Sequence, residues 1–245
     1  MKITNKNNES IQDIDSWGIA LGKPIHWKEG RSAHSLAKFF TSPTIEESIG
    51  CKKIKEYLSK CGIDNIKFDK AIIEYNSKFD TYRGKTREHD MVIWGETNNQ
   101  DVIICIEAKV DEKFNGNYVN EAYLKKLGTT SNIPNRIEGL RDKFFPGQDI
   151  STLTGIRYQL LYYLAGSVSE ARNGEIVFMP ILVFHTDAYN TKNGEKNKKD
   201  FDKFIISLGF SLCDADKQVY KGHFEGVDVY ISYIDISEDE LNGIL

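Results

Sequence analysis

The sequence predicts an α/β protein with a central mixed β-sheet flanked by helices. Short apolar runs rich in β-branched residues are typical of buried strands, and helical patterns stand before and between them. Their order is a helix, three strands, a helix and a fourth strand. A chain of 245 residues, 40% of them hydrophobic, can bury a full core, so we expect residues 1–245 to form a single domain.

The N-terminal part is predicted to be loose at first and then helical. Residues 1–15 are polar and are expected to lie loosely, with the domain starting near Trp17. A short helix is expected over residues 31–40. A second helix is expected to run to about Cys61 and to end at Gly62.

Three strands are predicted to form a meander after these helices. The first covers residues 66–75. The next two, at residues 91–94 and 102–110, are separated by a Gly- and Asn-rich segment. We therefore expect an antiparallel hairpin that turns near Asn98 and Asn99.

A helical insertion is predicted at residues 113–155, because this stretch is too long for a simple connection. Its helical candidates are residues 119–127 and 137–145, and we expect it beside the active face of the sheet. A helix over residues 156–172 and a buried strand over residues 176–184 follow.

Pro180 lies within that last strand and predicts a bulge or an edge position, because proline has no N–H for the ladder. Residues 192–200 carry four lysines and are predicted to be a polar loop, either simply solvated or in contact with phosphate. Residues 201–245 are expected to form a C-terminal elaboration, with a helix at residues 201–208 and a hairpin at residues 218–236.

The hairpin carries the strongest functional signal of the chain. Side chains alternate along a strand, so Glu107 and Lys109 share one face of the second run. If the two runs pair, Asp90 lies opposite this segment. Two carboxylates that converge repel each other unless a cation lies between them, and hard oxygen donors suit Mg²⁺. A surface salt-bridge ladder is the plainer interpretation, but Ile103 and Cys105 make this strand apolar on both faces, which indicates burial.

This pattern resembles the PD-(D/E)XK, or restriction-endonuclease-like, nuclease superfamily. Its signature is an acidic residue on one strand and (D/E)-x-K on the next, which Asp90 and Glu107-Ala108-Lys109 match. The chain departs from the signature at His89, which stands where the superfamily has proline. The resemblance implies a restriction-endonuclease-like core in which Asp90, Glu107 and the Ala108 carbonyl hold Mg²⁺ or Mn²⁺ while Lys109 positions the attacking water.

A second match lies in the predicted helix, where Gln159 and Tyr163 form the Q-x-x-x-Y element of the RecB-like exonuclease branch. Residues four apart share one helical face, so the pair borders the apolar stripe. An interfacial glutamine and a core tyrosine are the alternative. We expect Gln159 to act in catalysis, and Tyr163 and Arg157 to contact substrate, because arginine forks onto phosphate oxygens.

Glu47 is a further candidate metal ligand. It falls on the same predicted helical stripe as Ile54 and Leu58, and the first core helix of the resembling superfamily often supplies a glutamate. The sequence offers an equally good structural role, because Thr44 and Glu47 have the spacing of a capping box.

Composition narrows the function classes. Lys and Arg total 32 against 36 Asp and Glu, a net charge of -4, so the whole chain lacks the basic excess of avid DNA binders. The four cysteines show no C-x-x-C spacing and no signal sequence or membrane span is apparent, so we expect a cytoplasmic protein with reduced thiols. P-loop, dinucleotide and G-x-S-x-G motifs are also missing.

We therefore expect a metal-dependent nuclease that hydrolyses phosphodiester bonds, with DNA as the more favoured substrate. The rivals are a catalytically silent member of the same fold that binds nucleic acid or a protein partner, and an interaction protein with a decorative acidic cluster. The sequence leaves open whether the protein works as a homodimer.

Overall fold

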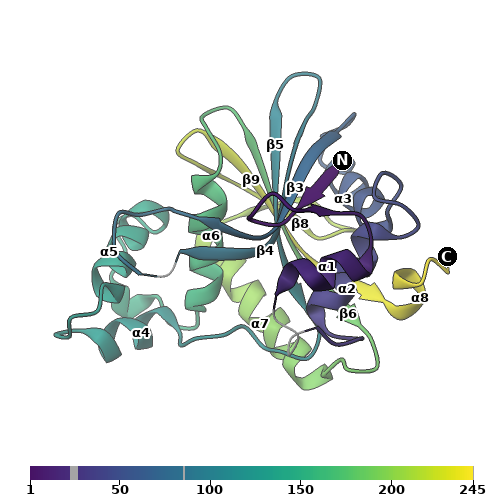
Figure 1. Ribbon diagram of the computed structural model, residues 1–245. Helices are drawn as coiled ribbons and strands as arrows, with labels where there is room; N and C mark the ends of the chain where they lie inside the picture. Colours follow the sequence, from purple (N-terminus) through teal and green to yellow (C-terminus); the bar gives the residue numbers. More distant parts are fainter. Residues whose placement is uncertain (23–26, 85, 245) are drawn as a thin grey trace.

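A computed structural model describes residues 1–22, 27–84 and 86–244. Its described part contains nine strands in one mixed sheet, in the order β2-β1-β3-β4-β5-β6-β9-β8-β7 (Figure 1). The strands are β1 (Lys2–Thr4), β2 (Ser10–Ile11), β3 (Lys67–Ser77), β4 (Arg87–Glu96), β5 (Asp101–Lys109), β6 (Ile176–His185), β7 (Ser211–Asp214), β8 (Val219–Phe224) and β9 (Val227–Ser237). The chain is an α/β protein, as predicted.

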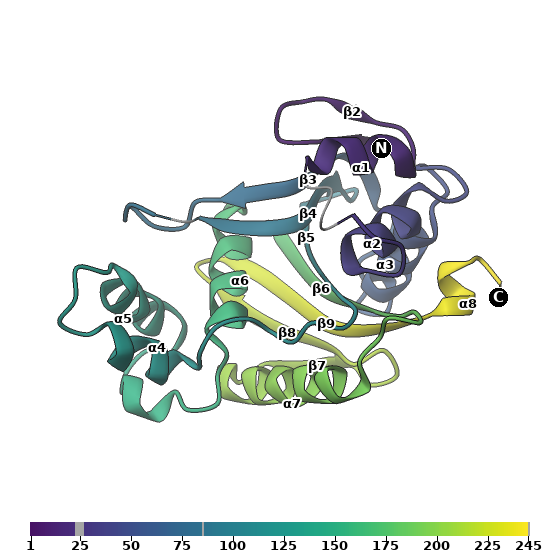
Figure 2. The same cartoon turned by 60° about the horizontal axis from the view of Figure 1, so that its bottom comes forward.

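Helices cover both faces of the sheet and bury one apolar cluster on each (Figure 2). One face carries α1 (Ile14–Leu21), α2 (Ser32–Thr41), α3 (Ile49–Ser59) and α8 (Glu238–Leu241). The other carries α4 (Val119–Lys126), α5 (Ile133–Phe144), α6 (Tyr158–Ser169) and α7 (Thr191–Leu208). The strongly apolar strands β5 and β6 lie in the middle because both of their faces are covered.

The central hairpin forms as predicted. Strands β4 and β5 pair antiparallel from Glu96 opposite Asp101 to Met91 opposite Ile106. The Thr97 hydroxyl accepts hydrogen bonds from the N–H groups of Asn99 and Gln100 and so closes the turn. Strand β5 then pairs with β6 in parallel, and β6 pairs with β9 in parallel.

The insertion forms a helical arm, α4 and α5, at one end of α6 (Figure 2). Both helices lie close to their predicted ranges. The C-terminal hairpin of β8 and β9 is also confirmed, and the structure adds the short strand β7 at its outer edge.

The N-terminus is not loose, which corrects the expectation for residues 1–15. Strand β1 pairs in parallel with β3, and β2 pairs with β1. Ile3 and Ile11 are each 1% exposed, and Asn5 is buried with its side chain bonded to the turn between the two strands. Two isolated apolar residues among polar ones gave too weak a strand pattern to predict this.

The lysine-rich segment at residues 192–200 is helical rather than a loop. It forms the first half of α7, which Asn190 caps by accepting from the Asn193 N–H. Its buried side carries Asn197 and Asp200, so polar residues occupy positions where a helical pattern is expected to be apolar. Its lysines lie on or toward the solvent side.

Pro180 causes neither a bulge nor an edge, because β6 lies between β5 and β9 without a register shift. The ladder with β5 lapses only beside the proline, which has no N–H to give to the Cys105 carbonyl. The Tyr163 hydroxyl donates to that carbonyl instead and also lies 3.2 Å from the Pro180 carbonyl oxygen. A helix side chain thus replaces the missing ladder bond.

The cysteines also depart from the expectation of four thiols. Cys61 and Cys213 form a disulfide between the end of α3 and β7, across 152 residues of sequence. Cys51 and Cys105 are free and buried. In the described part of the chain, no helix is long and apolar enough to cross a membrane.

Candidate active site

The predicted acidic pair lies where β4 and β5 separate. The last ladder pair is Met91 with Ile106. Beyond it, the Asp90 carboxylate takes the place of a ladder partner, because its Oδ2 accepts from the Ala108 N–H at 2.7 Å. Among the described residues, Oδ1 of Asp90 has no hydrogen-bond partner. The divergence of the strands leaves room for this carboxylate beside the backbone of Glu107 and Ala108.

Glu107 is almost fully buried, at 4% exposure, and three side chains contact its carboxylate. Arg87 on β4 pairs with Oε2. Lys109 Nζ lies 2.7 Å from Oε1, and Gln159 Nε2 donates to the same oxygen at 2.7 Å. The structure therefore brings Asp90, Glu107, Lys109 and Gln159 together from β4, β5 and α6.

The pKa values of Asp90 and Glu107 are shifted in opposite directions. Burial and the neighbouring Glu107 charge raise the pKa of Asp90 to about 8. Burial alone would also raise the pKa of Glu107, but the cations of Arg87 and Lys109 lower it to about 2. The Lys109 pKa is raised, because its two carboxylate neighbours outweigh burial. Glu107 is thus charged and compensated by two direct ion pairs, whereas Asp90 feels the same two cations without forming an ion pair with either.

Gln159 connects three parts of the fold. Its amide N–H donates to Glu107, and its amide oxygen accepts from the Asn115 N–H at the start of the insertion. Helix α6 thus lies close enough to the hairpin for Gln159 to reach Glu107 on β5. In this structure the amide holds Glu107 and the backbone of the insertion, so Gln159 is a positioning residue.

Tyr163 does not line an open site. It is 1% exposed, and its hydroxyl is committed to the sheet at Cys105 and Pro180. The predicted alternative of a core tyrosine is therefore the one observed. His89 lies against it with ring centroids 5.7 Å apart, and neither ring nitrogen of this buried histidine has a described hydrogen-bond partner. Burial, together with the Arg87 charge, lowers its pKa well below the usual value.

Arg157 is likewise buried and is not available to phosphate. Its Nε donates to Asp200 of α7 at 2.6 Å, and its Nη1 donates to the Gly116 carbonyl. Its guanidinium also lies 4.1 Å from the centre of the Tyr118 ring. This cluster fastens the insertion to α6 and α7, so the role of Arg157 is structural.

Glu47 does not join the site. It is exposed on the segment before α3, which begins at Ile49 with Ser48 as its N-cap. Its N–H donates to Thr44 Oγ1 at 3.3 Å, which is one half of the predicted capping box placed ahead of the helix. Its position before the helix removes it from the predicted stripe.

Two contributors were missed from the sequence. Arg87 opens β4 and was given no role, although a charged residue in line with buried strand positions indicates a buried partner. Asn197 was missed with its helix; its side chain bonds the N–H of Phe114 and the carbonyl of Glu112 just after β5. A stripe of Asn197, Asp200, Phe201 and Phe204 has helical spacing and was the available signal.

The donor set is small. Within the described residues, no group of three or more His, Cys, Asp or Glu side chains gathers as a metal site. Asp90, Glu107 and the Ala108 carbonyl are what the site offers to a cation. Mg²⁺ often takes one or two carboxylates and completes its shell with waters and substrate phosphate, so this set suits it.

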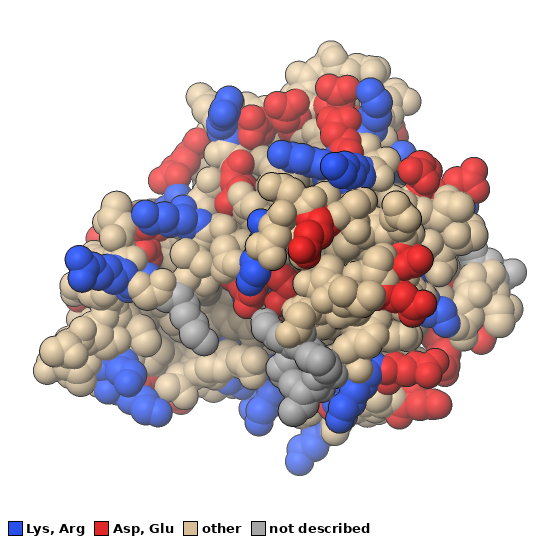
Figure 3. Space-filling model, in the orientation of Figure 1, with Lys and Arg blue, Asp and Glu red and all other residues tan. Residues whose placement is uncertain are grey.

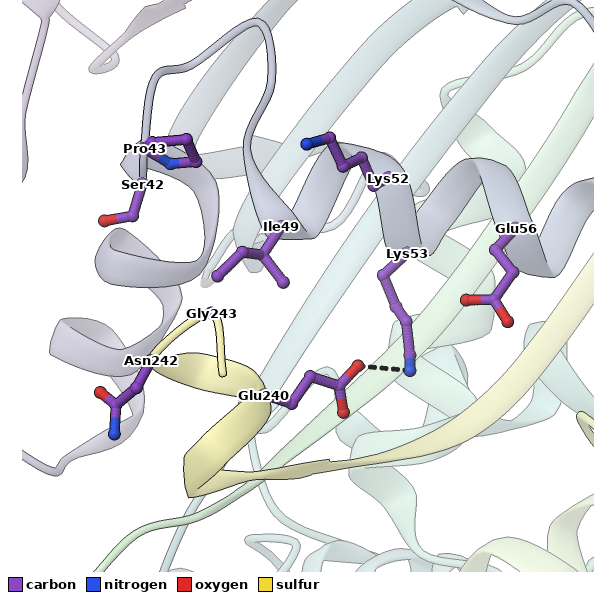
Figure 4. Close-up of a pocket in the computed structure, with 9 residues that line it drawn as sticks. All are labelled: Ser42, Pro43, Ile49, Lys52, Lys53, Glu56, Glu240, Asn242 and Gly243. Atoms are coloured by element: carbon purple, nitrogen blue, oxygen red, sulfur yellow. Dashed lines mark hydrogen bonds and ion pairs between the residues drawn. The ribbon is translucent and has the colours of Figure 1, made fainter. Parts of the chain in front are cut away.

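A separate cavity of about 780 Å³ lies between α3 and the C-terminal helix α8 (Figure 4). Lys53 and Glu240 form an ion pair in its wall. None of the site residues predicted from the sequence lines it.

Residues 10–238 match the model of a protein family described as a domain of unknown function, DUF6946. The match spans most of the chain, so the protein belongs to this family. No curated protein and no solved structure matches the chain.

Proposed function

We propose that the protein is a metal-dependent nuclease with a restriction-endonuclease-like core, which hydrolyses phosphodiester bonds in DNA. The observation that carries the proposal is the convergence of Asp90, Glu107 and Lys109 where β4 and β5 separate. Asp90 accepts from the Ala108 N–H, and Lys109 lies on the same carboxylate oxygen as Gln159. A salt-bridge ladder on a solvent-exposed face would not bury Glu107 and Lys109 to 4% exposure.

Asp90, Glu107 and the carbonyl of Ala108 would hold Mg²⁺ or Mn²⁺. The Oδ1 atom of Asp90, which has no hydrogen-bond partner among the described residues, supports this assignment. When bound, the metal would polarise the scissile phosphate and stabilise the charge that develops on it.

The side chains around this pair have distinct roles in the proposal. Lys109 donates a hydrogen bond to the attacking water and holds it in line with the phosphorus. Gln159 fixes the orientation of Glu107. Arg87 keeps Glu107 ionised.

The proposal is tested by incubating circular and linear DNA, each single- and double-stranded, with the protein and Mg²⁺ or Mn²⁺. We expect cleavage that Glu107→Gln abolishes. Glu96→Gln changes an exposed glutamate at the other end of β4 and should cut normally. Opening of circles identifies an endonuclease. Absence of cleavage of every DNA substrate, with nucleic-acid binding retained, would favour the catalytically silent alternative. In that alternative the Arg87 guanidinium takes the place of the metal ion beside Glu107.

A further inference from the structure

A cleft of about 660 Å³ adjoins the candidate active site. Arg87 and Gln159, which both contact Glu107, form part of its wall. The remaining wall comes from the β3–β4 connection, the start of α5 and the first turns of α6. Its other lining residues include Arg83, Asn132, Arg136, Tyr158 and Tyr162.

The two sides of the cleft are fastened together. Arg136 of α5 donates to both carboxylate oxygens of Asp80, which follows β3. The side chain of Asn132 donates to the Arg83 carbonyl at 3.2 Å. The arm is therefore clamped to the β3–β4 connection at two places, and the cleft exists before any ligand arrives.

Its wall combines aromatic rings with arginine side chains. Tyr158 and Tyr162 lie one turn apart on α6 with ring centroids 5.4 Å apart, and Phe79 packs edge-on to Tyr162 at 4.6 Å. The Arg136 guanidinium lies 5.6 Å from the centre of the Tyr162 ring. Tyr162 remains partly exposed.

Arg87 lies at the end of the cleft nearest Glu107. It is 7% exposed, and its Nε has no hydrogen-bond partner among the described residues. Among the described lining residues, Arg87 is paired with Glu107 and Arg136 with Asp80, whereas Arg83 is exposed. Figure 3 shows several Lys and Arg side chains on the side of the molecule that carries the arm, interspersed with Asp and Glu toward the top and centre of this face.

We propose that this cleft binds an unpaired nucleic-acid strand and leads it to the active site, so that the nuclease acts on single-stranded DNA or on frayed ends. This inference rests on the proposed function. Partly exposed aromatic rings offer stacking surfaces for bases, and the exposed Arg83 can pair with the phosphate backbone, which is how proteins hold single strands. Glu107 and Lys109 are recessed, and a flexible single strand reaches a recessed site more easily than a stiff duplex does.

The test is fluorescence anisotropy with a labelled single-stranded oligothymidylate of about 12 nucleotides, a length within the range that single-strand sites cover. A duplex of the same length is the comparison, and EDTA prevents cleavage. We expect the single strand to bind at least about tenfold more tightly. Tyr162→Leu should weaken binding by about fivefold to a hundredfold, because one stacking ring is lost, while Tyr162→Phe should bind nearly as the parent does.

Charge is tested separately with Arg83→Ala, which should weaken binding and reduce the salt dependence by about one phosphate contact. Arg172→Ala is the matched control, because Arg172 is exposed beyond the far end of α6. Circular dichroism of each variant shows whether it is folded.

Equal affinity for the two oligonucleotides, or unchanged binding by folded Tyr162→Leu and Arg83→Ala, would overturn the inference. The binding assay does not depend on catalysis. If the protein binds the single strand in this cleft but never cuts DNA, the inference stands and the proposed function is wrong. If the protein cuts duplex DNA and neither Tyr162 nor Arg83 contributes, the proposed function stands and the inference is wrong.

Discussion

Arg87 and Glu107 form a buried ion pair between β4 and β5, with side chains that are 8% and 6% exposed. Arg87 lies next to the position where the proposed metal ion would bind. The guanidinium and the metal ion would therefore both contact the Glu107 carboxylate. The charge of Glu107 is therefore balanced by side chains of the protein itself.

Arg87→Met is expected to destabilise the protein by about 3 to 5 kcal/mol, because it leaves Glu107 charged and buried with only Lys109 as a cationic partner. Saturating Mn²⁺ should restore part of this loss, since a ligand that binds only the native state shifts unfolding by mass action. Urea unfolding with and without Mn²⁺ measures both effects. An equal metal response in Glu107→Gln would show that the ion binds elsewhere.

Stability without metal is expected to fall as the pH rises from about 7 to about 8, a range above the titration of the buried His89, whose lowered pKa opposes this trend at lower pH. The folded-state pKa of Asp90 is raised to about 8 from 3.8, so the proton on Asp90 stabilises the fold, and this contribution is lost as the pH passes through the folded value. Asp90→Asn should flatten the profile over this range. The measurement is the free energy of unfolding in EDTA at several pH values. A parent profile as flat as that of the variant would contradict the assignment.

Lys109→Met should lower the cleavage rate by at least about a hundredfold, which is the lower range for a group that handles a proton or water in the transition state. The methionine keeps most of the buried stem, so the fold and the thermal shift caused by Mn²⁺ should persist. Single-turnover cleavage beside a metal titration separates the two properties. Full activity in the folded variant would rule out the role of Lys109.

Gln159→Ala should slow cleavage by about tenfold to a hundredfold without abolishing it, because one hydrogen bond to a charged group is lost. Gln159→Glu should slow cleavage further than Gln159→Ala does, since it places a second carboxylate against Glu107. Gln12→Ala, at an exposed glutamine near α1, is the control. The single-turnover rate decides the matter, and a parental rate in Gln159→Ala would mean that Glu107 needs no support from α6.

Tyr163→Phe should cost about 1 to 3 kcal/mol of stability, because the buried Cys105 carbonyl loses its donor. Pro180→Ala restores an N–H at that point of the ladder. The cost of Tyr163→Phe should therefore be smaller in a Pro180→Ala background, as measured by a double-mutant cycle of unfolding free energies. Additive effects would show that the two residues do not share the carbonyl.

The hairpin and its acidic residues could be predicted because the information is local. Alternation along β5 places Glu107 and Lys109 on one face, and a short turn sets the register that brings Asp90 opposite. The partners of those residues could not be predicted in the same way. Arg87 pairs with Glu107 only because the ladder ends after Met91, and no sequence spacing records where two strands part.

Elements whose buried positions are polar were also missed. Helix α7 buries Asn197 and Asp200 because the insertion and Arg157 supply their partners, and those partners lie 43 or more residues away in sequence. Strand β1 is three residues long, and it is a strand because it pairs with β3. Such features depend on tertiary contacts, which override local propensity.

The replacement of a ladder bond by the Tyr163 hydroxyl has an evolutionary consequence. Proline at position 180 is tolerated in the middle of the sheet only while a hydroxyl on α6 can donate to the Cys105 carbonyl. Positions 163 and 180 are therefore expected to covary among homologues. Relatives with another residue at position 180 are released from tyrosine at position 163. The tyrosine of the Q-x-x-x-Y pattern would then track the proline rather than the catalytic residues, and an alignment of the family would reveal it.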